Sequence, residues 1–231
     1  MYDWNKFWTI HKVTKAEAWL ISERQAILNR CLDGLKPGMK NIIEVGCGAA
    51  SNLRLLKGSR SDINCYALDS STEAIARVKD EIPDAVLGDC FKPPFEDKKF
   101  DLIYSAGLME HFEDETGFVR EMHRILKDDG RIVTFVPGRF TLWQLHQLLF
   151  FTFLSGGYER SYTYSKLKAA FEDNGFETEL FCGLDPFSLQ GAIMRVFNIS
   201  FTPLFRRSLF NSAYTELCLV VKKKQAGVKA P

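Results

Sequence analysis

The chain has 231 residues, a formal net charge of +1, a hydrophobic fraction of 46% and a charged fraction of 26%. These values are ordinary for a soluble globular protein, and the small net charge argues against the strong positive field of a nucleic-acid-binding protein. The six cysteines include no C-x-x-C pair, and the chain shows neither a signal-peptide pattern nor an apolar run long enough to span a bilayer, so we expect a reduced, cytoplasmic protein.

The N-terminal segment, residues 1–36, is predicted to be helical, and its second half has the pattern of an amphipathic helix that ends near Gly34. From residue 40 to 137, short apolar segments alternate with helical ones. The predicted strands are 41–45, 63–68, 84–87, 100–105 and 131–136, and the predicted helices are 50–57, 71–80 and 113–127, the last ended by Gly130. Because these strands are apolar rather than alternating, they suit a sheet that is buried on both faces. Repeated β-α-β units then predict an α/β fold with a Rossmann-like doubly wound, mainly parallel sheet and helices on both faces.

After residue 137 the composition changes, because most of the 19 phenylalanines fall within residues 135–210. The pattern there predicts helices at 141–154 and 165–173, a strand at 176–181 and an antiparallel closing strand at 214–221. We expect the whole chain, 1–231, to form a single domain whose cofactor-binding core is 40–137.

Two aromatic insertions, 138–160 and 187–210, interrupt this C-terminal region. One interpretation is additional core that covers the sheet, and the other is a lid over a largely apolar acceptor pocket. The second insertion also carries Arg195, Arg206 and Arg207, which would allow peripheral contact with a membrane surface.

The most informative segment is N-I-I-E-V-G-C-G-A-A-S, residues 41–51, in which an apolar strand runs into two glycines and a helical pattern. Gly46 and Gly48 have no Cβ atom, so their backbone can take a positive φ and approach a ligand closely. The free N–H groups at a helix start favour an anionic or electron-rich group. Glu44 supports a ligand site, because a carboxylate in a buried strand needs a partner. The alternative is a turn that only joins strand to helix.

Further polar residues follow the next three strands. Asp69 ends the second strand, Asp89 and Cys90 follow the third, and Ser105 ends the fourth. Ligands of such sheets bind outside the C-terminal ends of the strands, and an acid after the second strand can accept hydrogen bonds from ribose hydroxyls. Any single acid could be a helix cap or a turn residue. Acids at successive strand ends together predict a nucleoside site.

These motifs resemble those of the class I S-adenosylmethionine-dependent methyltransferases, in particular the small-molecule, type 11 subgroup that includes the quinone-biosynthesis enzymes. The resemblance covers roughly residues 40–137. It rests on I-I-E-V-G-C-G, A-L-D-S-S-T-E-A-I, the acid at 89, F-K-P-P-F-E-D-K-K-F-D-L-I-Y-S-A-G-L-M-E-H-F and E-M-H-R-I-L-K-D-D-G-R-I-V. It implies an enzyme that uses S-adenosyl-L-methionine, releases S-adenosyl-L-homocysteine, and transfers the methyl group in line to a small acceptor. The aromatic residues of 141–154 are too dense for a helix with one buried stripe, so we expect a hydrophobic or aromatic acceptor rather than protein. Nucleic acid is disfavoured because the basic residues are few and scattered.

The resemblance also implies roles for individual residues. Glu44 would orient the glycine turn and the cofactor's amino group, Asp69 would bind the ribose, and Asp89 would accept a hydrogen bond from the adenine N6 amino group. The full set implied for the cofactor is Glu44, Gly46, Cys47, Gly48, Asp69, Ser70, Asp89, Cys90 and Ser105. The family often has a glycine where this chain has Ala50, and we expect a slightly different turn there rather than lost binding.

His111 lies just beyond the fourth strand and is the candidate base for an acceptor that must lose a proton. The alternative is a structural histidine that is hydrogen-bonded near the turn. No spacing of metal ligands is visible, so no metal is expected. The sequence does not indicate an oligomeric state.

Three other functions share parts of this pattern. A nicotinamide-dependent oxidoreductase would have its third glycine where Ser51 stands, and it has no use for Asp89. An aminopropyl transferase would need more acids than the phenylalanine-rich region offers. A protein that binds S-adenosylmethionine without catalysis also remains an alternative.

Overall fold

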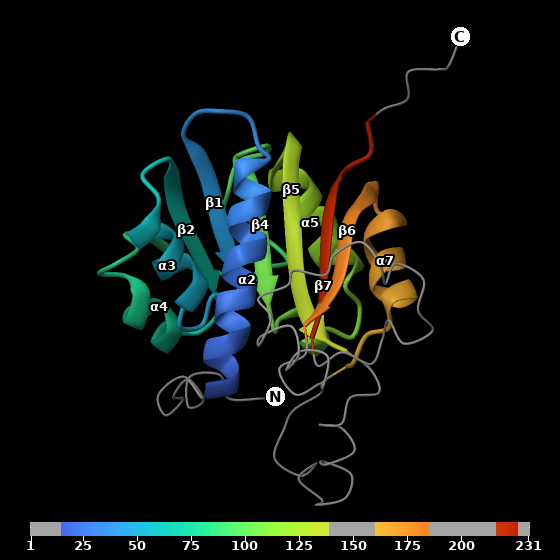
Figure 1. Cartoon of the computed structure of the whole chain (residues 1–231), viewed down its shortest axis with the longest axis horizontal. Helices are drawn as coiled ribbons and strands as arrows, with labels where there is room; N and C mark the ends of the chain where they lie inside the picture. Colours follow the sequence, from blue (N-terminus) through green and yellow to red (C-terminus); the bar gives the residue numbers. More distant parts are fainter. Residues whose placement is uncertain (1–14, 139–159, 185–215, 226–231) are drawn as a thin grey trace, which may run out of the picture.

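A computed structural model of the chain describes residues 15–138, 160–184 and 216–225. The helix predicted at 141–154 and the insertion 187–210 therefore lie outside the described residues, as does most of the insertion 138–160. The described residues form a seven-stranded sheet in the order β3-β2-β1-β4-β5-β7-β6 (Figure 1).

The strands are β1 (Lys40–Val45), β2 (Ile63–Asp69), β3 (Asp84–Leu87), β4 (Phe100–Ala106), β5 (Leu126–Pro137), β6 (Phe176–Leu184) and β7 (Glu216–Lys223). Strand β7 is antiparallel to its neighbours β5 and β6, and the other pairs in the sheet are parallel. The predicted α/β, doubly wound sheet with an antiparallel last strand is thereby confirmed.

The helices are α2 (Lys15–Asp33), α3 (Ser51–Ser59), α4 (Thr72–Val78), α5 (Thr116–Ile125) and α7 (Tyr164–Glu172), with a short 3-10 helix η1 (Met109–His111). Helices α2 and α3 pack on one face of the sheet, and α5 and α7 pack on the other. The strand pattern explains both layers, since successive side chains of a strand point to opposite faces. Ile42 contributes to the α2 side and Ile43 to the α5 side.

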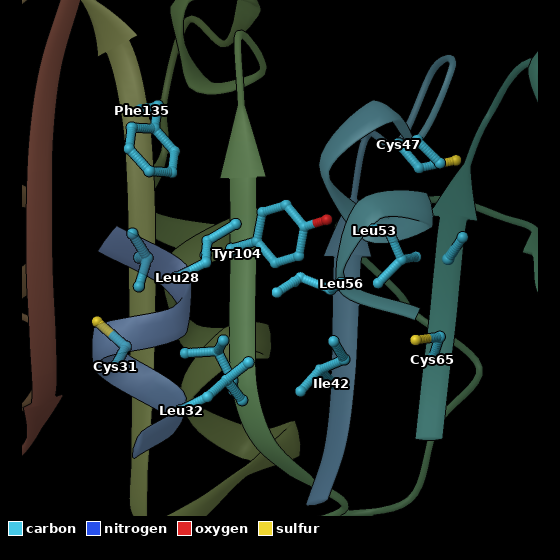
Figure 2. Close-up of a cluster of buried hydrophobic side chains, with 14 of the residues drawn as sticks. Leu28, Cys31, Leu32, Ile42, Cys47, Leu53, Leu56, Cys65, Tyr104 and Phe135 are labelled. Carbon is cyan, nitrogen blue, oxygen red and sulfur yellow. The ribbon is translucent and has the colours of Figure 1, made fainter. Parts of the chain in front are cut away.

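The core on the α2 side joins Leu28 and Leu32 of α2 to Leu53 and Leu56 of α3, with Ile42 of β1 between them (Figure 2). These five side chains are fully buried. Burying one such side chain contributes roughly 1.5–3 kcal/mol relative to leaving it in water. The N-terminal helix is therefore fixed to the sheet along this apolar stripe.

The predicted end of the helix at Gly130 is wrong, because α5 ends at Ile125 and residues 126–130 belong to β5. Leu126 is buried and already pairs with Phe100 of β4, so the chain enters the sheet there. Gly130 serves close packing rather than capping. A Cβ atom on it would lie 3.0 Å from the carbonyl oxygen of Asp101 and 2.8 Å from Leu126 Cδ1.

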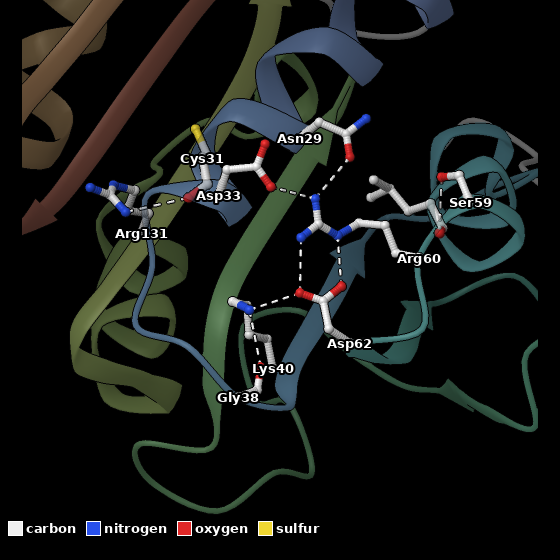
Figure 3. Close-up of polar contacts among 10 residues, drawn as sticks. Asn29, Cys31, Asp33, Gly38, Lys40, Ser59, Arg60, Asp62 and Arg131 are labelled. Atoms are coloured by element: carbon white, nitrogen blue, oxygen red, sulfur yellow. Dashed lines mark hydrogen bonds and ion pairs between the residues drawn. The ribbon is translucent and has the colours of Figure 1, made fainter.

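A charged network around Arg60 ties together the starts of β1 and β2 (Figure 3). The Arg60 guanidinium donates 2.9 Å hydrogen bonds to both carboxylate oxygens of Asp62 and a 2.7 Å bond to Asp33 at the end of α2. Lys40 donates to the same Asp62 carboxylate over 2.9 Å. One arginine therefore links α2 to the segment between α3 and β2, and through Asp62 to β1.

Candidate cofactor and catalytic site

The turn between β1 and α3 has the backbone that the glycine pattern predicts. Gly46 has a φ of 68° and Gly48 a φ of 49°, and the N–H groups of Gly46 and Cys47 both donate to the carbonyl of Leu68, over 2.8 and 3.1 Å. A Cβ atom on Gly46 would lie 2.7 Å from Leu108 Cδ1. The side chain of Cys47 is buried, and this burial raises the pKa of its thiol.

Ala50, the residue for which a different turn was expected, caps the start of α3. It has φ 50° and ψ 37°, a left-handed conformation, and its N–H donates to the Cys47 carbonyl over 2.6 Å. An L-residue with a side chain pays roughly 1–2 kcal/mol for this conformation. The chain thus keeps a sharp turn here at the expense of local backbone strain.

Asp69 ties the glycine turn to the start of α4. Its Oδ2 accepts a 2.8 Å hydrogen bond from the Gly48 N–H, and its Oδ1 accepts a 2.9 Å bond from the Ser71 N–H. Burial raises the pKa of this carboxyl, and the backbone N–H groups of Gly48, Ser70 and Ser71 oppose the rise. A carboxylate has about four lone-pair sites, so these three N–H groups leave acceptor capacity for a ligand. Ser70 is exposed beside it.

Asp89 and Cys90 lie just beyond β3, next to Asp69. The N–H of Gly88 donates to the main-chain carbonyl of Asp69 over 2.9 Å, which holds the two segments together. Asp89 is exposed, and its Oδ1 accepts from the Phe91 N–H over 2.8 Å. Cys90 is half-buried, and burial raises the pKa of its thiol to about 12.

Glu44 is buried on β1 with its carboxylate beneath the start of α3. Tyr104, directly opposite on β4, donates a 2.7 Å hydrogen bond to Glu44 Oε2, and the first-turn N–H of Leu53 in α3 donates to the same carboxylate. Burial raises the pKa of Glu44 to about 8, while the Tyr104 bond and the charge of Arg24 act in the opposite direction. The sequence analysis missed Tyr104, although the hydroxyl of a buried tyrosine usually needs a hydrogen-bond partner.

A second group that the sequence analysis missed is the ion pair between Arg24 of α2 and Glu216 of β7. The Arg24 Nε donates to Glu216 Oε2 over 2.9 Å, and its Nη2 donates to Oε1. The guanidinium also lies 5.5 Å from the centre of the Phe135 ring. Its charge acts on Glu44 and Glu110 as well, so α2 brings a cation to the carboxylates at the strand ends.

Ser105 and His111 lie in different surroundings. The Ser105 hydroxyl is buried and lies 3.1 Å from the hydroxyl of Thr134 on β5, so its side chain is engaged with the neighbouring strand. His111 ends η1, is half-buried, and donates its backbone N–H to the Leu108 carbonyl over 3.2 Å. The structure therefore places Glu44, Asp69 and Asp89 at the same end of the sheet as the glycine turn. His111 lies on the loop that follows β4.

In the part of the chain that the structure describes, no three or more His, Cys, Asp or Glu side chains are grouped so that they could hold a metal ion. All six cysteines are free thiols. None of the described helices is long and apolar enough to cross a membrane.

Comparison with known proteins gives one family and several relatives. Residues 43–134 match the family model described as "Methyltransferase domain". The chloroplastic tocopherol O-methyltransferase of Arabidopsis thaliana is 32% identical over 103 residues, which are 41% of this chain and 29% of that protein. The demethylmenaquinone methyltransferase of Thermotoga maritima is 28% identical over 129 residues, 49% of this chain and 56% of that protein. The chain thus spans about half or less of the length of these curated relatives.

Solved structures show the same fold. The phosphoethanolamine N-methyltransferase 2 of Haemonchus contortus, in complex with S-adenosyl-L-methionine, superposes with a TM-score of 0.63 at 16% identity, over 97% of this chain and 61% of that one. A SAM-dependent methyltransferase of Archaeoglobus fulgidus gives a TM-score of 0.61 at 18% identity, over 88% of this chain and 94% of that one.

Proposed function

We propose that this chain, whose residues 43–134 belong to the type 11 group of the class I S-adenosylmethionine-dependent methyltransferases, transfers a methyl group from S-adenosylmethionine to a small acceptor. The observation that carries the proposal is the bond between the glycine turn and the acid of the second strand, Gly48 N–H to Asp69 Oδ2 at 2.8 Å. It places a glycine backbone and a carboxylate side by side at the strand ends, where nucleoside ligands of this architecture bind.

The described residues fit S-adenosylmethionine by their chemistry. Asp69 keeps acceptor capacity for the ribose, and the exposed carboxylate of Asp89 can accept from the adenine amino group. Glu44 is a buried carboxylate whose ionised form a cationic ligand would stabilise. Gly46 and Gly48 both have a positive φ, which lets the turn bend sharply beside these carboxylates. When bound, the cofactor supplies an electrophilic methyl group and a thioether leaving group.

The role of the chain in such a reaction is to hold two reactants in line. Displacement at a methyl group depends chiefly on proximity and orientation, which can lower the barrier by several kcal/mol. For an oxygen or nitrogen acceptor that must lose a proton, we propose that His111 accepts it, because it stands on the loop after β4 at the same end of the sheet. Ser105 is proposed as a lining residue through its backbone, since its hydroxyl bonds Thr134.

We propose a hydrophobic or aromatic acceptor. Two relatives are named for tocopherol and demethylmenaquinone, and most phenylalanines of this chain lie in or near the insertions 138–160 and 187–210. A net charge of +1 supports a small molecule rather than nucleic acid, although one relative of 29% identity is a putative 23S rRNA methyltransferase of Bacillus subtilis. Membrane contact through Arg195, Arg206 and Arg207 is a further proposal.

We also propose that residues 1–231 act as one methyltransferase domain in the cytoplasm. The support for the location is the set of free thiols at all six cysteines. The plant relatives carry chloroplastic names, so cell fractionation of the tagged protein is the test.

The first experiment measures thermal unfolding with S-adenosylmethionine, S-adenosylhomocysteine or NADH. A ligand at a hundredfold excess over its dissociation constant should stabilise the protein by about 2.7 kcal/mol. A shift with NADH alone would contradict the proposal and favour the oxidoreductase. The second experiment offers labelled cofactor with reduced demethylmenaquinone, phosphoethanolamine or ribosomal RNA. Label in the quinone product supports the proposal, whereas binding with no transfer to any of them favours the non-catalytic alternative.

A further inference from the structure

The loop that carries His111 is held by a residue almost 50 positions further along the chain. The backbone N–H of Arg160 donates to the carbonyl of Glu110 over 2.8 Å. Its Nη2 donates to the carbonyls of Phe112 and Glu113, the latter over 2.7 Å. The same nitrogen lies 3.1 Å from a carboxylate oxygen of Glu115. One residue thus binds three carbonyls and one carboxylate within six consecutive residues, 110–115.

A second anchor lies two residues later. The hydroxyl of Tyr162 donates to the carbonyl of Met109 over 3.1 Å, and its side chain is fully buried. The Tyr162 N–H donates to the carbonyl of Pro137 at the end of β5 over 3.0 Å. The Arg160 guanidinium lies 5.8 Å from the centre of the Tyr162 ring. The segment 160–162 is therefore itself fixed to the sheet, so it can act as a rigid support.

The helical part of this loop is a single short turn. η1 is a 3-10 helix of three residues, and the N–H groups of His111 and Phe112 bond the carbonyls of Leu108 and Met109 at 3.2 Å each. A single turn of this kind is not stable alone. The side-chain contacts of Arg160 all come from Nη2, which the long, planar guanidinium places among three acceptors. The ammonium of lysine is a point charge on a different stem and would not reproduce this placement.

We infer that Arg160 is a positioning residue for methyl transfer: it fixes the His111 segment, residues 109–113, against the end of the first aromatic insertion. The inference rests on the proposed function for its catalytic meaning. Arg160 is the last residue of the insertion 138–160, which is expected to meet the acceptor. The same residue therefore belongs to that insertion and binds the loop that carries His111. The contacts of Arg160 described above involve neither the glycine turn nor Asp69. Cofactor binding should therefore not depend on Arg160.

The test compares Arg160→Ala and Arg160→Lys with a matched control, Arg131→Ala. Arg131 has a similar exposure, 18% against 15% for Arg160, and also binds a carboxylate and a carbonyl, those of Glu179 and Cys31. Amide hydrogen exchange should rise by about tenfold or more at His111 and Phe112 in Arg160→Ala, to a smaller extent in Arg160→Lys, and not at all in Arg131→Ala. The dissociation constant for S-adenosylhomocysteine should stay within about twofold of the wild-type value in all three.

The kinetic arm uses reduced demethylmenaquinone as acceptor. Arg160→Ala should lower kcat on the order of 10- to 100-fold while the KM for S-adenosylmethionine stays unchanged, and Arg160→Lys should recover part of the loss. Unchanged exchange at His111 in Arg160→Ala, or an equal rise in Arg131→Ala, would overturn the inference. If the wild type transfers no methyl group, the proposed function is at fault, and the exchange result still decides whether Arg160 positions the loop. If Arg160→Ala does not fold, Glu115→Gln takes its place, because it removes the charge that pairs with Arg160 Nη2. Hydrogen exchange should then rise only at the amides of His111 and Phe112.

Discussion

The hydroxyl of Tyr104 donates a 2.7 Å hydrogen bond to Oε2 of Glu44 across the pair of strands β4 and β1. Both side chains are buried, with exposed fractions of 1% and 5%. Burial raises the pKa of Glu44 to about 8, even though this bond and the charge of Arg24 favour the ionised carboxylate. Near neutral pH this carboxyl is therefore largely protonated before any ligand is bound.

The first prediction is a stability that falls with rising pH because of Glu44. In the unfolded chain the carboxyl ionises above its ordinary pKa of 4.5, whereas in the folded chain it keeps its proton until about pH 8. The folded state binds one more proton in this window, so the free energy of unfolding should decrease by about 1.4 kcal/mol per pH unit from this group. Urea unfolding of the wild type and of Glu44→Gln at several pH values measures this decrease in the free energy of unfolding. Equal slopes in the two proteins would contradict the prediction.

The second prediction is release of a proton when S-adenosylmethionine binds. A cationic group beside Glu44 favours the carboxylate, so the raised pKa should fall on binding. At neutral pH the release should approach one proton per site, and calorimetry in buffers with different ionisation enthalpies reads it directly. Glu44→Gln should bind without this release. A binding enthalpy that does not vary with buffer in the wild type would show that the cofactor does not act on Glu44.

The third prediction is that Asp69→Ala weakens cofactor binding more than Asp89→Ala. Hydrogen bonds to a charged carboxylate contribute roughly 1.5–3 kcal/mol each, and Asp69 is proposed to make two to the ribose against one main contact at Asp89. The structure adds a second cost, because Asp69 also orders the Gly48 and Ser71 amides. Calorimetry with S-adenosylhomocysteine measures both variants. Affinities like that of the wild type in both would refute the two assignments.

The parts of the fold that sequence could predict are those set by local pattern. The apolar runs before Gly46 and Asp69 and the short connections between them are enough to indicate parallel strands with the site at their ends. The pairing of Arg24 with Glu216 could not be predicted, because their 192-residue separation leaves no local signal and many charged residues on α2 were candidates. The predicted end of α5 was wrong for a similar reason, since a contact distant in the sequence decides where the helix ends. D-D-G resembles a helix end, and only the pairing of Leu126 with Phe100 overrides it.

The fourth prediction concerns the network around Arg60. Arg60→Ala should lower the free energy of unfolding by about 1–2 kcal/mol, since it removes a bidentate pair with Asp62 and the link to Asp33. Arg60 and Lys40 hold the pKa of Asp62 well below its usual 3.8. The stabilisation is present above the ordinary pKa of aspartate and is lost as pH falls below it.

Lys98→Ala is the matched control for this network, because Lys98 and Asp128 form an exposed pair with exposed fractions of 60% and 69%, in which Asp128 keeps a 3.4 Å contact with Lys223. It should change stability by less than about 0.5 kcal/mol. Denaturant unfolding at neutral pH compares the two variants. Equal effects would show that the network behaves as ordinary surface pairs.

The fifth prediction contrasts Gly46, in the turn between β1 and α3, with Gly58, near the end of α3. Gly46 has a φ of 68°, and a Cβ atom there would lie 2.7 Å from Leu108 Cδ1, so Gly46→Ala meets both backbone strain and a clash. The Leu108 side chain can move, so the strain sets the expected loss of about 1–2 kcal/mol. Gly58 lies within α3, and a Cβ atom on it meets nothing within 4 Å. Gly58→Ala should therefore stabilise the protein by about 0.5–1 kcal/mol through helix propensity.

Cofactor affinity separates these two effects further. Gly46→Ala should weaken S-adenosylhomocysteine binding, because the added methyl group strains a turn with a positive φ and displaces Leu108, the residue that precedes η1. Gly58→Ala should leave the dissociation constant within about twofold of the wild-type value, since its effect is confined to the helix. Thermal unfolding and calorimetry on the same preparations give both quantities. A Gly46→Ala protein with unchanged affinity would mean that the ligand does not use this turn, and the site would then have to lie elsewhere along the strand ends.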